Sequence, residues 1–249
     1  GSLATLAAAA EIEAGRYGLA AVLGIEQMRN VPGDQAAKLI GGSAMWAGHE
    51  CTDVRFPWPH VFSLLADEYD RRYGLDHRHL AQIAQLNFAN ARRNPNAQTR
   101  RWVFSEESFG TDERANPVID GHMRKQDCGQ ITDGAAIIFL ASEPVARAYA
   151  ARRGLGLEAL ARLRGWGHRT APITYAQKVA ASRDEPYVFP WVRRTITDAF
   201  RRAGIAGIGQ IVGIRPHASS TPSAYTALVR SAITPPGESW RAIEAGDIE

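Results

Sequence analysis

The stretch Asp127–Ser142, DCGQITDGAAIIFLAS, decides the predicted fold. Within it, Ala135–Ala141 is apolar throughout and lacks the polar alternation of a strand with one wet face. It therefore predicts a strand buried on both faces, as in layered α/β proteins whose sheets carry helices on both sides. Asp133 and Gly134 predict a turn before this strand, and Pro144 predicts a helix that begins just after it.

The residues on either side predict further helices and strands. From the spacing of apolar residues we expect helices over 3–14, 62–73, 76–93, 144–153, 175–182 and 190–203, and buried strands over 19–25 and 211–214. Asp76 is an expected N-cap, and Gly74 and Gly204 are expected helix stops. Residues 30–60 are predicted to be irregular. Residues 99–123 offer only a candidate strand at 101–104, and residues 157–164 predict a strand or a helix–strand junction.

Composition limits the class of protein. With 249 residues, 45% of them hydrophobic and 22% charged, the chain can bury a core in one large domain or two small ones. No apolar run approaches the roughly 20 residues that span a membrane, and no signal-type segment opens the chain. Two cysteines make no disulfide framework, so a reducing, cytoplasmic setting is expected.

Arginine pairs recur along the chain, although the net charge is only +3. They can be solvated helix ends, where cations complement the helix dipole. They can also form a basic groove for a phosphate-rich ligand such as coenzyme A, because guanidinium groups bind phosphate bidentately. Nucleic acid is not expected, since no aromatic residues are interleaved with the pairs. The pairs are Arg71-Arg72, Arg92-Arg93, Arg100-Arg101, Arg152-Arg153, Arg193-Arg194 and Arg201-Arg202.

No metal site is predicted. His49 and Cys51 are two positions apart, but no second pair of ligands stands at matching spacing. His77 and His79 lack the i, i+4 spacing of helical ligands and are expected to be exposed polar residues. Cys128 precedes a strand rather than opening a helix, so it is expected to be an unreactive thiol.

Several stretches carry a family resemblance. They are GIEQM at 24–28, YGLDHRHLAQIAQLNFANARRNPNAQ at 73–98, DGAA at 133–136 and TPPGESWRAIEAGDIE at 234–249. Together they resemble the thiolases, and in particular the sterol-carrier-protein-type acetyl-CoA acetyltransferases. The resemblance implies part of a layered α/β/α/β/α fold, incomplete at both ends. Residues 1–30 and 127–153 would belong to the N-terminal half, 31–126 to an irregular, mainly helical loop domain, and 154–249 to the C-terminal half.

The resemblance also implies an activity: Claisen-type acyl transfer, or its thiolytic reverse, with a coenzyme A thioester as substrate and no bound cofactor. The nucleophilic cysteine would lie three positions before Gly1, outside this chain. His217 would orient a water and help form the oxyanion hole. His168 and Arg169, in the loop GWGHRT at 165–170, are either part of a structural turn or contacts to the acyl or coenzyme A group. A homodimer or larger homo-oligomer is implied, and an OB-fold/zinc-ribbon partner subunit is one option.

The chain departs from the family pattern beside His217. Ala218 stands where the family has aspartate, Ser219-Ser220 where it has Cys-Phe, and Ala224 where it has glutamate. The C-terminal Gly-His-Pro and Cys-x-Gly motifs are not in the chain. Two alternatives therefore stay open: a non-catalytic thiolase-like subunit that binds a partner, and a carbon–carbon lyase of the same fold. Alone, the chain is expected to be inactive and to leave apolar surface bare.

Overall fold

The computed structural model describes residues 1–205, without the side chains of residues 42–48. This part of the chain mixes helices and strands, as expected for the α/β class. Its helices are α1 (Ser2–Glu13), α2 (Gly33–Gly48), α3 (Pro57–Tyr73), α4 (His77–Arg93), α5 (Glu143–Arg152), α6 (Tyr175–Ala181) and α7 (Pro190–Ala203). Its strands are β1 (Leu19–Glu26), β2 (Val118–Asp120), β3 (Met123–Arg124) and β4 (Gly134–Ala141). Short 3-10 helices are η1 (Glu106–Phe109), η2 (Lys125–Asp127) and η3 (Leu157–Ala159).

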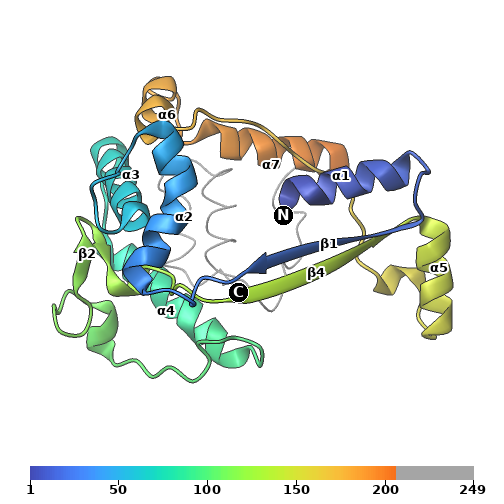
Figure 1. Cartoon of the computed structure of the whole chain (residues 1–249), viewed down its shortest axis with the longest axis horizontal. Coiled ribbons are helices and arrows are strands. Elements are labelled where there is room, and N and C mark those ends of the chain that lie inside the picture. The colour runs from blue at the N-terminus through green and yellow to red at the C-terminus, as the bar shows by residue number, and fades with distance from the viewer. Residues whose placement is uncertain (206–249) are drawn as a thin grey trace.

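Strands β1 and β4 form a two-stranded antiparallel sheet, the strand pair, which links the helical part of the molecule to α5 (Figure 1). Its register pairs Leu19 with Ala141 and Glu26 with Gly134. Helix α1 packs on this pair. Both strands occur where the sequence predicted them.

The predicted burial of these strands is wrong. Ile25 is 66% exposed and Phe139 is 65% exposed, and nearly every residue of β4 is exposed. The reason is that this sheet has two strands among the described residues, and α1 is the main element that covers it. A contiguous apolar surface of this kind is typical of an interface with other protein.

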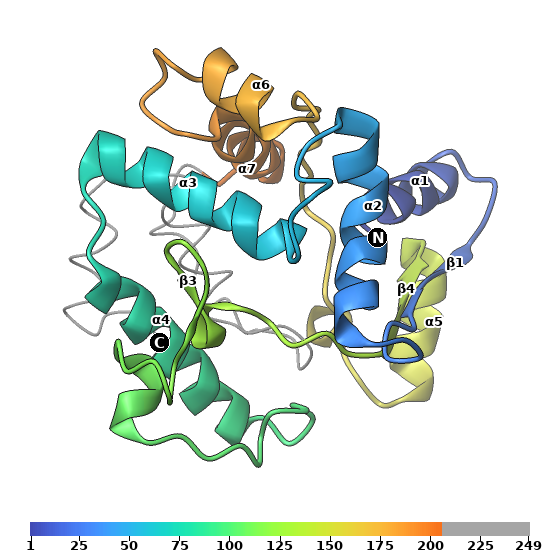
Figure 2. The same ribbon diagram turned by 60° about the vertical axis from the view of Figure 1, so that its left-hand side comes forward.

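The β2–β3 hairpin packs against α3 within the helical part (Figure 2). Its turn residue, Gly121, has a φ of +46°, and a Cβ there would lie 2.0 Å from the hydroxyl of Ser63 in α3. Next to it, the amide of His122 donates a hydrogen bond of 2.9 Å to the same hydroxyl. Gly121 is therefore required both by its backbone conformation and by the close approach of α3.

Helix ends follow the expected chemistry. The carboxylate of Asp76 accepts a hydrogen bond of 2.9 Å from the amide of Arg78, so the predicted N-cap of α4 is confirmed. Gly74 ends α3 at a φ of +77°, and Gly204 ends α7 in the left-handed conformation. A residue with a Cβ is strained at a positive φ, which explains why both positions hold glycine.

Three predictions for the connecting segments are wrong. Residues 30–60 are not irregular, because α2 occupies Gly33–Gly48. Residues 157–164 hold the 3-10 helix η3 followed by a segment without regular structure, rather than a strand. Residues 101–104 form no strand either. Trp102 and Phe104 instead belong to a cluster of rings with Phe88 of α4, in which the Phe88 and Phe104 centroids are 4.3 Å apart.

The segment 164–169 lies directly on the backbone of α7. A Cβ on Gly165 would come within 2.2 Å of the Ala199 carbonyl oxygen, and a Cβ on Gly167 within 1.9 Å of the Thr195 carbonyl oxygen. The guanidinium of Arg202 stacks on the Trp166 ring at 3.9 Å and donates to its carbonyl at 2.6 Å. The segment can pack this closely on α7 only because Gly165 and Gly167 have no Cβ.

A buried ion pair attaches the later part of the chain to α3. The side chains of Glu68 and Arg72 are 9% and 7% exposed and form an i, i+4 pair. Arg72 also donates to the carbonyls of Ser182 and Glu185, at 3.1 and 3.2 Å. Hydrogen bonds from Arg71 and then Arg72 lower the pKa of Glu68 to about 2, although burial acts in the opposite direction. We call this set the α3 clamp.

Replacing Gly167 with alanine should lower the free energy of unfolding by about 2 kcal/mol or more, since the new methyl group overlaps the backbone of α7. Urea unfolding followed by circular dichroism measures this change. Gly24→Ala is the matched control, because a Cβ there meets no atom within 4 Å. Its effect should stay within about 0.5 kcal/mol. Equal losses in the two variants would contradict the packing of segment 164–169 on α7.

The α3 clamp should make stability depend on acid pH. Because the pKa of Glu68 is lowered by folding to about 2, its contribution is present above the unfolded pKa of about 4.3 and is lost as pH falls toward 2. Urea unfolding of the wild type and of Glu68→Gln at pH 7, 4 and 3 checks this. We expect the difference between the two proteins to shrink as pH falls. A difference that is constant over this range would overturn the assignment.

Candidate functional site

A cavity of about 850 Å³ lies where the strand pair meets the helical part of the molecule. It is lined by Arg29, by residues of 88–102 at the end of α4 and in the following loop, and by residues of 128–135 that lead into β4. We call it the junction cavity. Its volume is in the range of small-molecule sites, which run from about 300 to 1,000 Å³.

Asp133 connects the two strand ends that border the junction cavity. Its carboxylate accepts hydrogen bonds from the amides of Met28 and Arg29, at 2.7 and 2.8 Å. The backbone carbonyl of Asp133 accepts a hydrogen bond of 3.2 Å from Nε2 of the Gln98 side chain. The hydroxyl of Thr132 donates to Oε1 of the same side chain. The segment after β1, the loop after α4 and the segment before β4 are therefore joined at one residue.

The lining of the junction cavity is rich in neutral hydrogen-bonding groups. Amide side chains come from five positions, and Phe88 and Trp102 add aromatic surface. Arg29 is its cationic lining residue and Asp133 its anionic one. Such a lining suits a ligand that combines amide or hydroxyl groups with an apolar body. The amide residues are Asn90, Asn94, Asn96, Gln98 and Gln130.

Cys128 also lines the junction cavity, and it is not activated. Burial, followed by the nearby charge of Asp127, raises the pKa of the Cys128 thiol to about 11. A thiol with this pKa stays protonated near pH 7, whereas nucleophilic cysteines have lowered pKa values. The cavity thus provides binding groups without a thiolate of its own, in line with the expectation that Cys128 is unreactive.

The site residues suggested by the sequence lie elsewhere. His168 is exposed, and Arg169 forms an ion pair with Asp198 of α7, with 2.6 Å between Nη2 and Oδ2. Neither lines the junction cavity. His217, with Ala218, Ser219 and Ser220, falls outside the described residues. The proposed roles of these residues stay predictions.

A histidine cluster that sequence reasoning missed holds the β2–β3 hairpin on the helices. Nδ1 of His60 lies 3.1 Å from Asp120, and Nε2 of His122 lies 2.9 Å from Asp67. His77, expected only as an exposed polar residue, is exposed but stacks on His122 with 3.2 Å between ring nitrogens. The partners are 45 to 60 positions apart, so spacing gave no signal of them.

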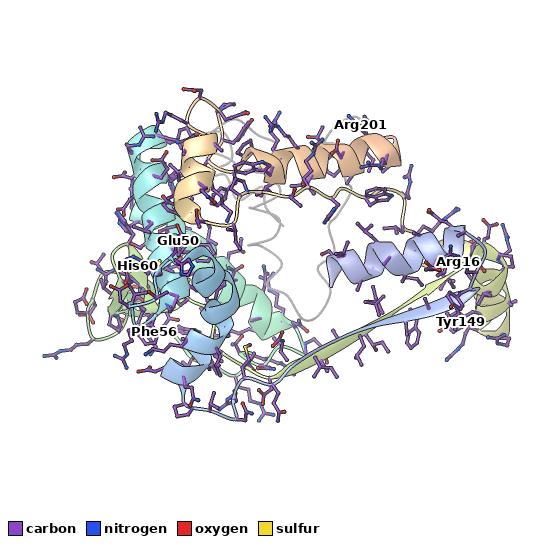
Figure 3. All side chains as sticks on the ribbon, turned by 45° about the horizontal axis from the view of Figure 1, so that its top comes forward. Arg16, Glu50, Phe56, His60, Tyr149 and Arg201 are labelled. Carbon is purple, nitrogen blue, oxygen red and sulfur yellow. The ribbon has the colours of Figure 1, made fainter. Side chains whose placement is uncertain are left out.

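Glu50 performs a similar positioning task at the start of α6. Its carboxylate accepts hydrogen bonds from the amides of Tyr175 and Ala176, at 2.8 and 3.1 Å. Figure 3 shows Glu50 near His60 in the helical part, far from Arg16 and Tyr149 at the other end of the strand pair. Both the cluster and Glu50 support the helical part rather than the junction cavity. Within residues 1–205, no group of three or more His, Cys, Asp or Glu side chains could hold a metal ion.

The chain is 28% identical over 149 residues to an acetyl-CoA acetyltransferase of Methanothermobacter thermautotrophicus. The match covers 60% of this chain and 37% of that protein. No family model matches the chain. The relative supports the predicted resemblance to thiolases at the level of the family.

Among the described residues, no helix combines the length and the apolar character that crossing a membrane needs.

The hydrogen bonds to the Asp133 carboxylate should slow hydrogen exchange of the amides that donate them. In Asp133→Ala, the amides of Met28 and Arg29 lose their acceptor, so their hydrogen exchange should become about tenfold faster. Asp133→Asn keeps an acceptor oxygen and should retain most of the protection. The amide of Ser142, bonded to Gly18 at the far end of the strand pair, is the internal control. Faster exchange at Ser142 as well would mean that the strand pair, rather than the link, has been lost.

Proposed function

We propose that the chain is part of a thiolase-type acyl-CoA acyltransferase of the acetyl-CoA acetyltransferase group, in the sterol-carrier-protein-type branch. The observation that carries this proposal is the 149-residue similarity to an acetyl-CoA acetyltransferase. The motifs at 73–98 and 234–249 also support it, because both resemble the pattern of the sterol-carrier-protein-type branch.

The junction cavity is our candidate for the thioester-binding region. A coenzyme A thioester has two amides in its pantetheine arm and an apolar acyl group. The amide side chains of the cavity can pair with the former, and Phe88 and Trp102 can pack on the latter. Arg29 is placed to attract a phosphate group. In this proposal, residues 31–126 form the loop domain over the site.

The chemistry needs groups that this chain does not supply in activated form. We propose that a cysteine outside the chain attacks the thioester as thiolate, takes the acyl group and releases coenzyme A as the thiol. The acyl group then passes to the α-carbon of the second substrate, which gives up a proton, and the cysteine is freed. His217 would donate a hydrogen bond to the oxyanion that develops on the thioester carbonyl. His168 and Arg169 would contact the acyl or coenzyme A group. To make this contact, Arg169 would exchange its ion pair with Asp198 for the ligand.

The exposed strand pair fits a role within a larger layered assembly. We propose that β1 and β4 belong to the N-terminal half of an α/β/α/β/α fold, that residues 154–249 begin the other half, and that further strands and a second copy cover the apolar faces. The exposure of Ile25 and Phe139 supports this. The chain would not be active alone.

A second candidate function is a non-catalytic subunit that binds a partner, such as an OB-fold/zinc-ribbon protein. Two observations favour it. The carboxylates expected beside His217 are replaced by Ala218 and Ala224, and the strand pair offers apolar surface for a partner. A carbon–carbon lyase of the same fold is the third candidate, and it would need no cysteine nucleophile.

A thiolysis assay on the protein encoded by the whole gene separates these candidates. With acetoacetyl-CoA and coenzyme A as substrates, an acyltransferase forms acetyl-CoA. We expect His217→Ala to lower kcat by about 100-fold, the usual cost of removing one oxyanion donor. His79→Ala is the matched histidine control and should keep the rate.

Two results would exclude the acyltransferase. One is a whole-gene product with no cysteine three positions before Gly1. The other is the absence of thiolysis by a folded whole-gene product. Retro-aldol cleavage of a 3-hydroxyacyl-CoA, into a shorter acyl-CoA and an aldehyde or ketone, would then support the lyase. Stable complex formation without turnover would support the partner-binding subunit.

A further inference from the structure

A second cavity, open to solvent on one side, lies in the helical part and has no role in the proposed chemistry. It occupies about 290 Å³ between α3, α4, β3 and η2. We call it the helix-pair cavity. Its lining is predominantly apolar, with Asn87, Gln126 and Asp127 as its polar members. The apolar members include Phe62, Leu65, Tyr69, Leu80, Ile83 and Met123. It shares no lining residue with the junction cavity, so the two can be tested independently.

Asn87 is the feature of this cavity that the fold does not explain. It follows Ile83 and Ala84 by one helical turn, so it lies on the face of α4 that packs toward α3. Its Oδ1 is shielded from solvent and has no hydrogen-bond partner among the described residues. A buried acceptor without a partner costs about 1–3 kcal/mol of folding free energy. The unpaired side-chain oxygen of Asn87 therefore destabilises the fold unless something binds to it.

We propose that the helix-pair cavity binds a small amphiphilic molecule with an apolar body and one N–H or O–H group, which donates to Oδ1 of Asn87. The χ2 torsion of asparagine is broad, so a rotation of the amide can bring Oδ1 from the wall to the ligand. The donor then gives the amide a partner that the protein does not provide. The remaining contacts are apolar packing against α3 and α4.

Size and charge narrow the class of ligand further. An apolar cavity of about 150 Å³ takes a single benzene ring. The helix-pair cavity has about 290 Å³ and is open on one side, where Phe62 is 53% exposed, so it has room for a fused bicyclic ring or an alkyl-substituted phenol. Its lining includes the carboxylate of Asp127, which disfavours an anionic ligand. The ligand class is therefore amphiphilic and not anionic.

Indole and 1-methylindole test this inference on the purified 249-residue chain. The two probes have nearly the same shape, but only indole has an N–H donor. Isothermal titration calorimetry should give saturable binding of indole with a Kd near or below about 1 mM, and about fivefold to tenfold weaker binding of 1-methylindole. Amide NMR shifts should locate indole at Leu80–Asn87 rather than at the junction cavity.

Substitutions on α4 identify the group that recognises the donor. Asn87→Leu should bind the two probes equally, and it should be at least as stable as the wild type because it removes the unpaired amide. Asn90→Leu is the matched control, since Asn90 is on the same helix but lines the junction cavity. It should keep the wild-type preference for indole. Ala84→Leu, which fills the helix-pair cavity, should abolish binding of both probes.

Three results would overturn the inference. They are no binding of indole to the wild type, an unchanged preference for indole in Asn87→Leu, and loss of the preference in Asn90→Leu. None of them bears on thiolysis. Conversely, failure of the thiolysis assay leaves the binding result intact.

Discussion

The buried pair of Glu68 and Arg72 is the interaction on which the arrangement of the helical part depends. Taking a carboxylate and a guanidinium out of water is costly, and the cost is recovered only when both groups are fully hydrogen-bonded. Glu68 meets two arginines, and Arg72 binds two carbonyls in the segment between α6 and α7. The pair therefore sets where α6 and α7 lie relative to α3, while Glu50 fixes the start of α6.

Helix positions could be predicted because their signals are local. Asp76 at the N-cap of α4 and the glycines after α3 and α7 act on backbone groups within a turn. Helix α2 was missed, since paired glycines at 41–42 lower helix propensity and the packing of α2 on α3 leaves no local signal in the sequence. Burial of the strand pair could not be predicted from its apolar run, because burial depends on what covers a strand.

The region of the candidate site could be predicted only through resemblance, because its contacts join distant parts of the chain. The motif at 73–98 includes the end of α4 and the loop that lines the junction cavity. Nothing in the local sequence around Asp133 indicates that it accepts from the amides of Met28 and Arg29. Asn87 likewise has the spacing of a core position, and its unpaired oxygen is visible only once α3 and α4 are packed.

The register of the strand pair also has a consequence for how the chain folds. Pairing β1 with β4 brings together segments about as far apart as Met28 and Asp133, which are separated by 105 positions. Closing so long a loop costs chain entropy before any pairing contact is gained, whereas helices form from neighbouring residues. The helices between the two strands should therefore form first and shorten the effective loop, so that the strand pair assembles late. Changes in α2–α4 would then alter the folding rate of a sheet that they barely touch.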